Sequence, residues 1–412
     1  MIKFLPSIYP DEAVYSYLSR CYARSGYIWN TGFTKEIFER HTANIDCSFL
    51  NVLSPCFKIL IDKKIGIRRL LMDHTLFKYY VRFLPLERRI SITEKALQND
   101  SPIGKLLPIP PHTNTSSLRY CPRCIKEDRE KYGEAYIHTT HSIPYITVCP
   151  IHEIKLFNIE FIAQKINNTS FVPLEHSITT MDIINRGENN INTTLSKFVV
   201  EVFKAPLNLE DDIIIGNFLS NKLEDKYISP RGEQRHISQI WNDMQIFYAG
   251  LENFRTTQNR LASVYKNNSY NQYDILLISL FEAIKPIDLS SFNGSSEPRH
   301  LLFDSKVRNL YKSGLSMHRI SQILNTNHEV IRQIIIGTYD TPKHACSSYK
   351  CTKWDWDSID QFCCDEFSNI IPKITPVTKA SVAEAFNLKD KSLRNLPRLN
   401  AMIQSYKATS KH

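Results

Sequence analysis

The sequence predicts a mainly α-helical protein with a metal-binding module near its middle and helix-turn-helix modules toward its end. Three observations lead to this prediction. Apolar residues recur at helical spacing through most of the chain, between prolines, polar caps and glycines. Two short Cys/His phrases interrupt these helices with the spacing of a zinc site. Polar-capped helix pairs and most of the net positive charge occupy the last quarter.

The composition indicates an ordinary multidomain chain. Its 412 residues are 42% hydrophobic and 23% charged, which suggests two to four domains at roughly 100–200 residues each. No apolar run approaches the roughly 18 residues that span a membrane, and no secretory apolar core follows the N-terminus. We therefore expect an intracellular protein whose ten cysteines are thiols or metal ligands.

The region before the Cys/His phrases is expected to be helical. EAVYSYLSRCYARSG has one apolar face, follows Pro10 and Asp11, and stops at Gly26. The blocks KIGIRRLLMDHTLFKYYVRFL and ERRISITEKALQ continue the helical pattern, and the proline cluster LLPIPPHT marks its end.

The later part alternates loops and helices. Asn-rich loops follow Phe157, helices resume near Thr193, and KYISPRGEQRHISQIWNDMQIFY combines a Pro/Gly turn with an amphipathic segment. The expected division is residues 1–165, an N-terminal domain with a zinc module at about 119–153; 166–225, a polar connection and helix; 226–300, a helical module of a DNA-binding type; 301–340, a helix-turn-helix; and 341–412, a second basic helical module.

The most specific signal is CPRC followed by CPIH. Cys121 and Cys124 form one pair, and Cys149 and His152 form the second. Four such ligands fit the closed tetrahedral shell of one structural Zn²⁺, which leaves no position for a catalytic water. His138 and His141 lie between the pairs, on an expected extended segment, and remain alternative ligands.

A second group of metal-ligand residues has weaker spacing. It contains His344, Cys346, Cys351, Cys363 and Cys364. Packing accounts for these residues more simply than a second metal site, although a second zinc remains open.

The segment from Ser305 to Gly337 has the layout of a helix-turn-helix. The second helix starts at Ser316 and is expected to bury Ile320 and Ile323, and the third follows the cap Asn327. On the third helix, His328, Glu329, Arg332 and Gln333 are expected to face outward, where Arg and Gln can pair with base edges. A generic three-helix packing unit has the same apolar pattern and remains an alternative, but the basic surroundings and the polar groups at the helix start favour DNA binding.

A weaker second copy is expected in TKASVAEAFNLKDKSLRNLPRL. Ser381 to Phe386 would be its first helix and Lys391 to Leu396 its second. Lys389, Lys391 and Arg394 are candidate phosphate contacts. Residues 301–412 hold 16 Lys and Arg against 10 Asp and Glu, hence +6 of the net +9, which favours a polyanion.

The sequence favours a protein without catalytic activity. It contains no Gly-rich phosphate loop, no GxSxG and no HExxH. Asp355, Asp357 and Asp360 could in principle bind Mg²⁺ in a nuclease, but their spacing is more typical of a solvated helix start.

Several of these segments resemble one family. LRYCPRCIKEDREKYGEAYIHTTHSIPYITVCPIHEIKLF, HTLFKYYVRFLPLERR and FLPSIYPDEAVYSYLSRCYARSG resemble the TniQ domain of the TnsD/TniQ transposon target-selection proteins. KYISPRGEQRHISQIWNDMQIFY, the helix-turn-helix and the segments after Lys353 are similar to the TnsD branch. Two departures occur: Ile137 and His141 replace usual tryptophans, and Glu153 replaces a usual glycine.

The resemblance implies a DNA-binding adaptor of a cut-and-paste transposon, which is not an enzyme. Such proteins bind a chromosomal attachment site and recruit the AAA+ ATPase TnsC, which engages the transposase. The resemblance implies zinc ligation by the same four residues and a bacterial, cytoplasmic, nucleoid-associated protein. An alternative is a TniQ-like adaptor that links a CRISPR RNA-guided complex to TnsC.

Overall fold

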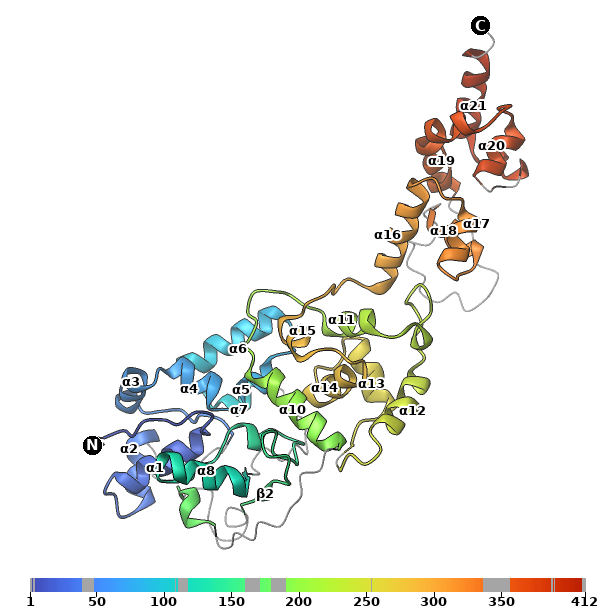
Figure 1. The fold of residues 1–412 in the computed structure, drawn as a ribbon. Coiled ribbons are helices and arrows are strands. Elements are labelled where there is room, and N and C mark those ends of the chain that lie inside the picture. Colours follow the sequence, from blue (N-terminus) through green and yellow to red (C-terminus); the bar gives the residue numbers. More distant parts are fainter. Residues whose placement is uncertain are drawn as a thin grey trace. The chain divides into compact units, whose positions relative to one another are not determined.

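Helices make up nearly all the regular secondary structure, which confirms the predicted fold class (Figure 1). The computed structural model describes residues 2, 4–38, 48–107, 109, 118–159, 171–178, 190–252, 254–335, 356–386, 388 and 390–409. No helix in these ranges has the length and apolar character needed to cross a membrane. The chain forms two compact units, residues 1–227 with 236–297, and residues 228–235 with 298–412. The expected 226–300 module is thus divided between them.

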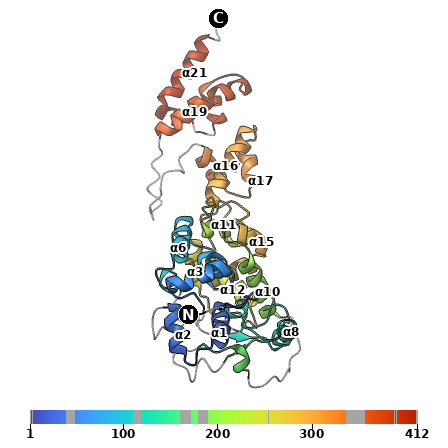
Figure 2. The ribbon, with the colours of Figure 1, turned by 90° about the vertical axis from the view of Figure 1, so that its left-hand side faces the viewer.

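The first unit combines the N-terminal helices, the Cys/His segment and a further group of helices (Figure 2). Its regular elements are α1 (Val14–Arg24), α2 (Asn30–Phe38), α3 (Pro55–Lys64), α4 (Ile67–Asp73), α5 (Phe77–Val81), α6 (Leu86–Gln98), α7 (Ile103–Leu106), β1 (Arg119–Tyr120), α8 (Pro122–Tyr132), η1 (Thr140–Ser142), β2 (Phe157–Asn158), η2 (Leu174–His176), α10 (Ile191–Lys204), α11 (Ile215–Lys222), η3 (Asp225–Tyr227), α12 (Ile237–Phe247), α13 (Gln258–Tyr265), α14 (Gln272–Phe281) and α15 (Pro286–Ser291).

The expected second helical block is interrupted. It forms the end of α3 and then α4 and α5 in place of one long helix. Gly66 adopts a positive φ of 88° between α3 and α4, a conformation that residues with a Cβ rarely adopt. The Thr75 hydroxyl, in the turn before α5, accepts the Phe77 N–H at 3.1 Å.

A buried ion cluster fixes α1. Glu12, Ser16 and Arg20 follow one another at helical spacing, and all three are buried. The Arg20 guanidinium donates to Glu12 at 2.7 Å and to Glu134 at 2.8 Å, and it stacks over the Tyr9 ring at 3.8 Å. Burial raises the pKa of Glu12 to about 7 even though the Arg20 charge opposes this shift.

Three segments that are distant in sequence meet at the start of α1. The Ala13 N–H donates to the Ile137 carbonyl at 2.7 Å, and the Val14 N–H donates to the His74 carbonyl at 2.8 Å. The His74 ring in turn donates from Nδ1 to the Glu12 carbonyl at 2.7 Å. The chain start, the HTLF block and the Cys/His segment therefore form one folded core.

Two buried arginines join these helices to α10. Arg82 donates to the carbonyls of Ala205 and Pro206 at 2.6 and 2.9 Å, directly after α10 ends. Burial lowers the pKa of Arg82 to about 10, so it stays charged at neutral pH beside the negative end of the helix dipole. Arg89 donates to two carbonyls of the loop that follows. The N-terminal helices therefore continue into one unit with the helices after residue 190.

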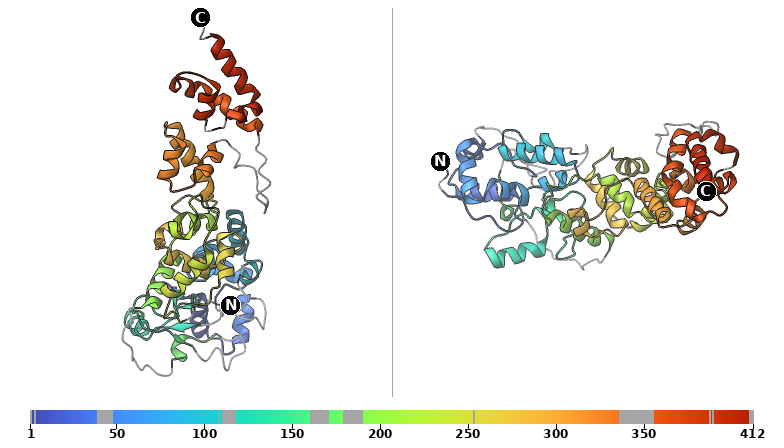
Figure 3. Two further views of the ribbon diagram at one scale, coloured as in Figure 1. Left: turned by 90° about the vertical axis from the view of Figure 1, so that its right-hand side faces the viewer. Right: turned by 90° about the horizontal axis from the view of Figure 1, so that it is seen from above.

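The second unit contains two small helical bundles, which Figure 3 shows from two further directions. The first consists of α16 (Arg299–Lys312), α17 (Met317–Ile323) and α18 (His328–Ile335), packed around Val307, Ile320 and Ile331. The second consists of α19 (Trp356–Ile370), η4 (Ile371–Lys373), α20 (Lys379–Ala385), η5 (Asp390–Asn395) and α21 (Pro397–Thr409). Phe362 packs against both apolar cores and links the two bundles.

Asp360 caps α21 in the second bundle. This buried carboxylate accepts the backbone N–H groups of Arg398 and Leu399, each at 2.9 Å. The expectation of a solvated helix start is therefore wrong for Asp360, although Asp357 is exposed. Asp355 lies outside the described residues.

We expect Asp360→Ala to destabilise the second unit by about 2–3 kcal/mol, because two buried N–H groups lose their acceptor. Asp360→Asn retains one acceptor oxygen and should cost less. The exposed Asp357→Ala is the control and should change the free energy of unfolding by less than about 0.5 kcal/mol. Urea denaturation of the three variants makes the measurement, and equal losses at the two positions would contradict the capping role.

His138 makes the stability of the first unit depend on pH. Its Nε2 lies 2.9 Å from Asp128 and its Nδ1 lies 3.4 Å from Asp11. Burial lowers the pKa of His138, but both carboxylates outweigh this effect and raise the pKa to about 9. The folded pKa exceeds the unfolded value, so this stabilisation is complete below about pH 6.5 and is lost as pH rises through 9.

We therefore expect His138→Gln to lower the free energy of unfolding by about 3 kcal/mol more at pH 6 than at pH 9.5, each relative to wild type at the same pH. The His236→Gln variant, at an exposed histidine outside this cluster, is the control for the substitution itself. Denaturant unfolding across the pH series measures both curves. A flat curve for His138→Gln would show that folding does not raise the pKa of this histidine and would contradict the prediction.

Candidate metal centre and nucleic-acid interface

The four predicted ligands converge on one point in the first unit. One ligand atom from each of Cys121, Cys124, Cys149 and His152 lies within 4.8 Å of the others. The His152 Nδ1 is 3.3 Å from Cys124 Sγ and 3.5 Å from Cys121 Sγ. Three sulfurs and one imidazole nitrogen in this arrangement fit a tetrahedral metal shell closed by protein. The three cysteines are buried and His152 is partly buried.

A short antiparallel ladder brings the two pairs together. β1 and β2 pair through Arg119 with Asn158 and Tyr120 with Phe157. β1 leads directly into Cys121, and β2 follows the second pair closely in sequence. Arg119 is buried and donates to the carbonyls of Ile143, at 2.6 Å, and Ile146, which fixes the loop between the pairs.

The CPRC phrase begins a helix and is not an isolated turn. Cys121 is the N-cap of α8, Pro122 occupies its first position, and Cys124 lies in its first turn. Proline suits this position because its fixed φ matches the helix and its missing N–H would have no intrahelical partner. The positive end of the helix dipole also favours thiolates here.

The CPIH phrase forms a tight turn that ends at Glu153. The Cys149 Sγ accepts the His152 N–H at 3.4 Å, and the Cys149 carbonyl accepts the Glu153 N–H at 2.9 Å. Glu153 has a φ of 59°, in the left-handed region that favours glycine. Its side chain pairs with Lys197 of α10. Glu153 therefore adopts a conformation that glycine would adopt without strain, and in its place gains an ion pair with α10.

A residue that the sequence analysis did not single out orients the ligand histidine. The His152 Nε2 lies 2.8 Å from Glu127 Oε1 on α8. Nε2 therefore donates to the carboxylate, which leaves the lone pair of Nδ1 directed at the three sulfurs. The position of Glu127, three residues after Cys124 on the same helix, is the only signal for this role in the sequence.

The alternative ligands have other contacts. His138 lies in an isolated bridge with Glu12 and is held by two carboxylates. His141 lies in the 3-10 turn η1 and not on an extended segment; its Nε2 is 3.8 Å from Cys124 Sγ, at the edge of the cluster. Ile137 and His141, which occupy the usual tryptophan positions, are both buried. They fill the core against which the centre packs.

The thiols share their protons unequally. Contacts with Cys121 and Cys149, together with burial, raise the pKa of Cys124. Contacts with Cys121 and Cys124 lower the pKa of Cys149. The three thiols would bind a metal ion as thiolates once deprotonated, so the cluster is suited to a soft or borderline divalent cation.

The second cysteine group is only partly described. His344, Cys346 and Cys351 lie outside the described residues. Cys363 is buried in the core of the α19–α21 bundle, and Cys364 packs against it. Among the described residues, one group of Cys, His and acidic side chains has the geometry of a metal site, the one formed by the four ligands above.

The second unit holds the predicted DNA-contacting residues. The Ser316 hydroxyl caps α17 by accepting the Arg319 N–H at 3.3 Å, and Asn327 accepts the Glu329 N–H at 2.8 Å before α18. Ile320 is buried as expected, but Ile323 is 51% exposed. The prediction for Ile323 was wrong because α17 is short and ends at this residue, beyond the packed turn.

The outer residues of α18 interact with one another. His328, Arg332 and Gln333 are partly exposed. Arg332 Nη1 lies 3.6 Å from Glu329, and Gln333 donates to Glu329 at 3.1 Å. Glu329 therefore orients the two side chains best suited to base recognition.

The bundle of α16, α17 and α18 also carries exposed cations that the sequence analysis did not identify as DNA contacts. Lys306, Arg308 and Lys312 on α16 and Arg319 on α17 are exposed. Asp304 of α16 is buried and paired, so it adds little negative field at the surface. The surface charge of the bundle is predominantly positive, as a polyanion partner requires.

The second bundle resembles the expected second copy only in outline. The predicted first helix is α20, but residues 390–395 form the 3-10 helix η5, and the longer α21 follows. Arg394 is exposed on η5. Lys389, and the side chain of Lys391, lie outside what the structure describes.

Comparison with known proteins finds similarity in the N-terminal part of the chain. The TniQ family model matches residues 3–156. Over 160 residues the chain is 24% identical to the transposon Tn7 transposition protein TnsD of Escherichia coli. That alignment covers 38% of this chain and 32% of the relative, about a third of the relative's length.

The matched region coincides with the folded core around the metal centre. It contains α1 to α8, the three segments that meet at Glu12, and all four candidate ligands. The three segments that resemble a TniQ domain are therefore in mutual contact. The chain therefore carries a TniQ domain over residues 3–156.

Proposed function

We propose that this chain is a target-site selector of a Tn7-type transposon. It binds a chromosomal attachment site as double-stranded DNA and recruits the AAA+ ATPase TnsC, without catalysing a reaction itself. The observation that carries this proposal is the combination of a TniQ domain with a separate helical unit whose first bundle is basic and capped like a helix-turn-helix.

The geometry of the second unit supports a DNA-reading role. α18 follows a capped turn and presents Arg332 and Gln333, which pair with guanine and adenine edges respectively. Exposed cations on α16 and α17 of the same bundle can neutralise DNA phosphates. A single helix in the major groove with flanking phosphate contacts is how helix-turn-helix proteins bind DNA.

The metal centre supports a scaffolding role. We propose that it binds one Zn²⁺ through Cys121, Cys124, Cys149 and His152. Four protein ligands close the shell, and the second-shell carboxylate of Glu127 fixes the histidine tautomer. When bound, the ion crosslinks the start of α8 to the turn at Cys149 and thereby stabilises the domain that would meet TnsC.

We expect the purified chain to contain one zinc per molecule, and Cys121→Ser and His152→Ala to lose it. The control Cys56→Ser removes an exposed thiol far in sequence from the ligands and should retain full metal content. Elemental analysis and thermal unfolding with and without chelator give the readout, with metal loss and a lower melting temperature expected together. Retention of zinc in His152→Ala but not in His141→Gln would assign the fourth ligand to His141.

We expect Arg332→Ala to lose about 1–3 kcal/mol of discrimination at one base pair of a duplex selected from a random library. Arg332→Lys keeps the charge but not the planar fork, so it should lose the same discrimination while retaining the salt dependence. Arg88→Ala, an exposed arginine of α6, is the charge-matched control. Binding of each variant to selected and random duplexes measures both effects.

Equal weakening on selected and random DNA would contradict base reading by α18. A wild-type chain that gives no footprint alone, yet co-purifies with a CRISPR RNA-guided complex and TnsC, would favour the adaptor alternative. Addition of TnsC to the protein–DNA complex, with a supershift as the expected result, tests recruitment.

A further inference from the structure

A loop from earlier in the chain is part of the second unit. Residues 228–235 leave the first unit and return to it, with Ile228 and Arg235 paired in an isolated bridge. The Ser229 N–H donates to the Gln234 carbonyl at 2.8 Å, and the Gly232 N–H donates to the Ser229 carbonyl at 2.7 Å. The loop is therefore a closed hairpin with Pro230, Arg231 and Gly232 at its tip.

Two contacts fix this tip on α16. Arg231 and Asp304 form a buried, bidentate pair, with Nε to Oδ1 at 2.8 Å and Nη2 to Oδ2 at 2.6 Å. Gly232 has a φ of 87°, and a Cβ at this position would lie 2.7 Å from the Arg299 Cβ. Only glycine allows the approach, so the loop has a defined position on the bundle.

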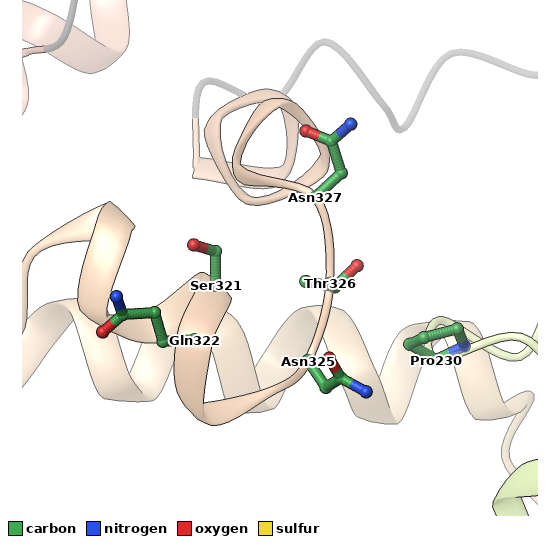
Figure 4. A pocket seen from close by; sticks show the side chains of 6 residues that line it. All are labelled: Pro230, Ser321, Gln322, Asn325, Thr326 and Asn327. Atoms are coloured by element: carbon green, nitrogen blue, oxygen red, sulfur yellow. The ribbon is translucent and has the colours of Figure 1, made fainter.

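The fixed loop forms one wall of a polar hollow beside α18. The hollow has a volume of about 490 Å³. Six residues line it: Pro230, Ser321, Gln322, Asn325, Thr326 and Asn327. Figure 4 shows Asn325 and Thr326 pointing from the α17–α18 turn toward Pro230 of the loop. Five of these six residues carry hydroxyl or amide groups, and none is charged.

The chemistry of this lining suits a sugar-phosphate backbone. Hydroxyl and amide groups donate to phosphate oxygens without reading sequence, and such contacts set the register of a protein on DNA. The hollow includes Asn327, which caps α18. A DNA strand in the hollow would therefore lie at the N-terminal end of α18, the helix proposed to enter the major groove. Exposed cations on α16 and α17 provide the attraction that the neutral lining lacks.

We propose that this hollow receives the sugar-phosphate backbone of one DNA strand and that the loop of residues 228–235 forms its second wall. The inference rests on the proposed DNA-binding function and adds to it a contact surface outside the three helices. It assigns Arg231 and Gly232 the role of positioning residues, because they hold the wall and do not themselves line the hollow.

The test uses the full chain and a 30-base-pair duplex of random sequence, titrated by fluorescence anisotropy at several NaCl concentrations. Pro230→Lys places a cation on the wall and should tighten binding while steepening the slope of log affinity against log salt by about one. Pro230→Glu should weaken binding by about tenfold or more. Both substitutions are at an exposed residue whose ring donates no hydrogen bond, so folding should be retained.

A second variant tests the neutral donors. Asn325→Gly combined with Thr326→Ala removes two side chains and should weaken binding about 5- to 30-fold with an unchanged salt slope, because no charge is lost. Glycine suits position 325, where φ is 46°. Lys312→Ala, the charged control, should lower the slope by about one.

The outcomes separate the two proposals. If wild type binds the duplex and both Pro230 variants and the double variant bind like wild type, the hollow is not a DNA contact and this inference is overturned, while DNA binding stands. If wild type binds no duplex at any salt concentration, the inference is overturned together with the proposed function.

Discussion

The buried ion cluster around Arg20 sets the architecture of the first unit. Burying the Arg20 guanidinium and the Glu12 carboxylate costs desolvation energy that only close pairing can offset, and loss of either group leaves the other buried and unpaired. Here the Arg20 guanidinium contacts Glu12 just before α1 and Glu134 just beyond α8. The N-terminal helix and the metal-binding segment therefore cannot separate without exposing an unpaired charge in the core.

The metal centre and the ion cluster act on different parts of the first unit. A metal ion bound by the four ligands would close one loop, from the start of α8 to the turn at Cys149. The contacts of α1 with His74 and Ile137 hold the Cys/His segment against the N-terminal helices. Burial raises the pKa of Glu12, and the nearby Arg20 charge opposes this shift and favours the ionised carboxylate in this core.

The sequence was sufficient for the features that depend on local pattern. The positions of α1, α6 and α10 follow from apolar periodicity, and the ligand set follows from two matched spacings. Contacts between distant residues could not be predicted in this way. Glu127 has a role only because His152 folds back onto α8, and Asp360 has one only because α21 starts beside it.

Predictions from apolar periodicity were wrong where the helix is shorter than the apolar pattern in the sequence. The segment around His74 continues an apolar stripe, but Gly66 and a turn at Thr75 interrupt it. Ile323 continues the stripe of Ile320, yet α17 ends there and the side chain reaches solvent. Periodicity reports which face would be buried in a helix, but it does not report whether another element covers that face.

The loop of residues 228–235 shows why domain boundaries are hard to place on a linear sequence. Its Pro/Gly composition predicts a turn, and a turn would normally end one domain and begin the next. Its tip instead packs on α16 through Arg231 and Asp304, two residues separated by an entire group of helices that belongs to the first unit. A buried bidentate pair of this kind is specific in geometry, so it defines which bundle the loop joins. The second unit is therefore assembled from two chain segments, and a fragment that begins at α16 would leave Asp304 buried without its partner.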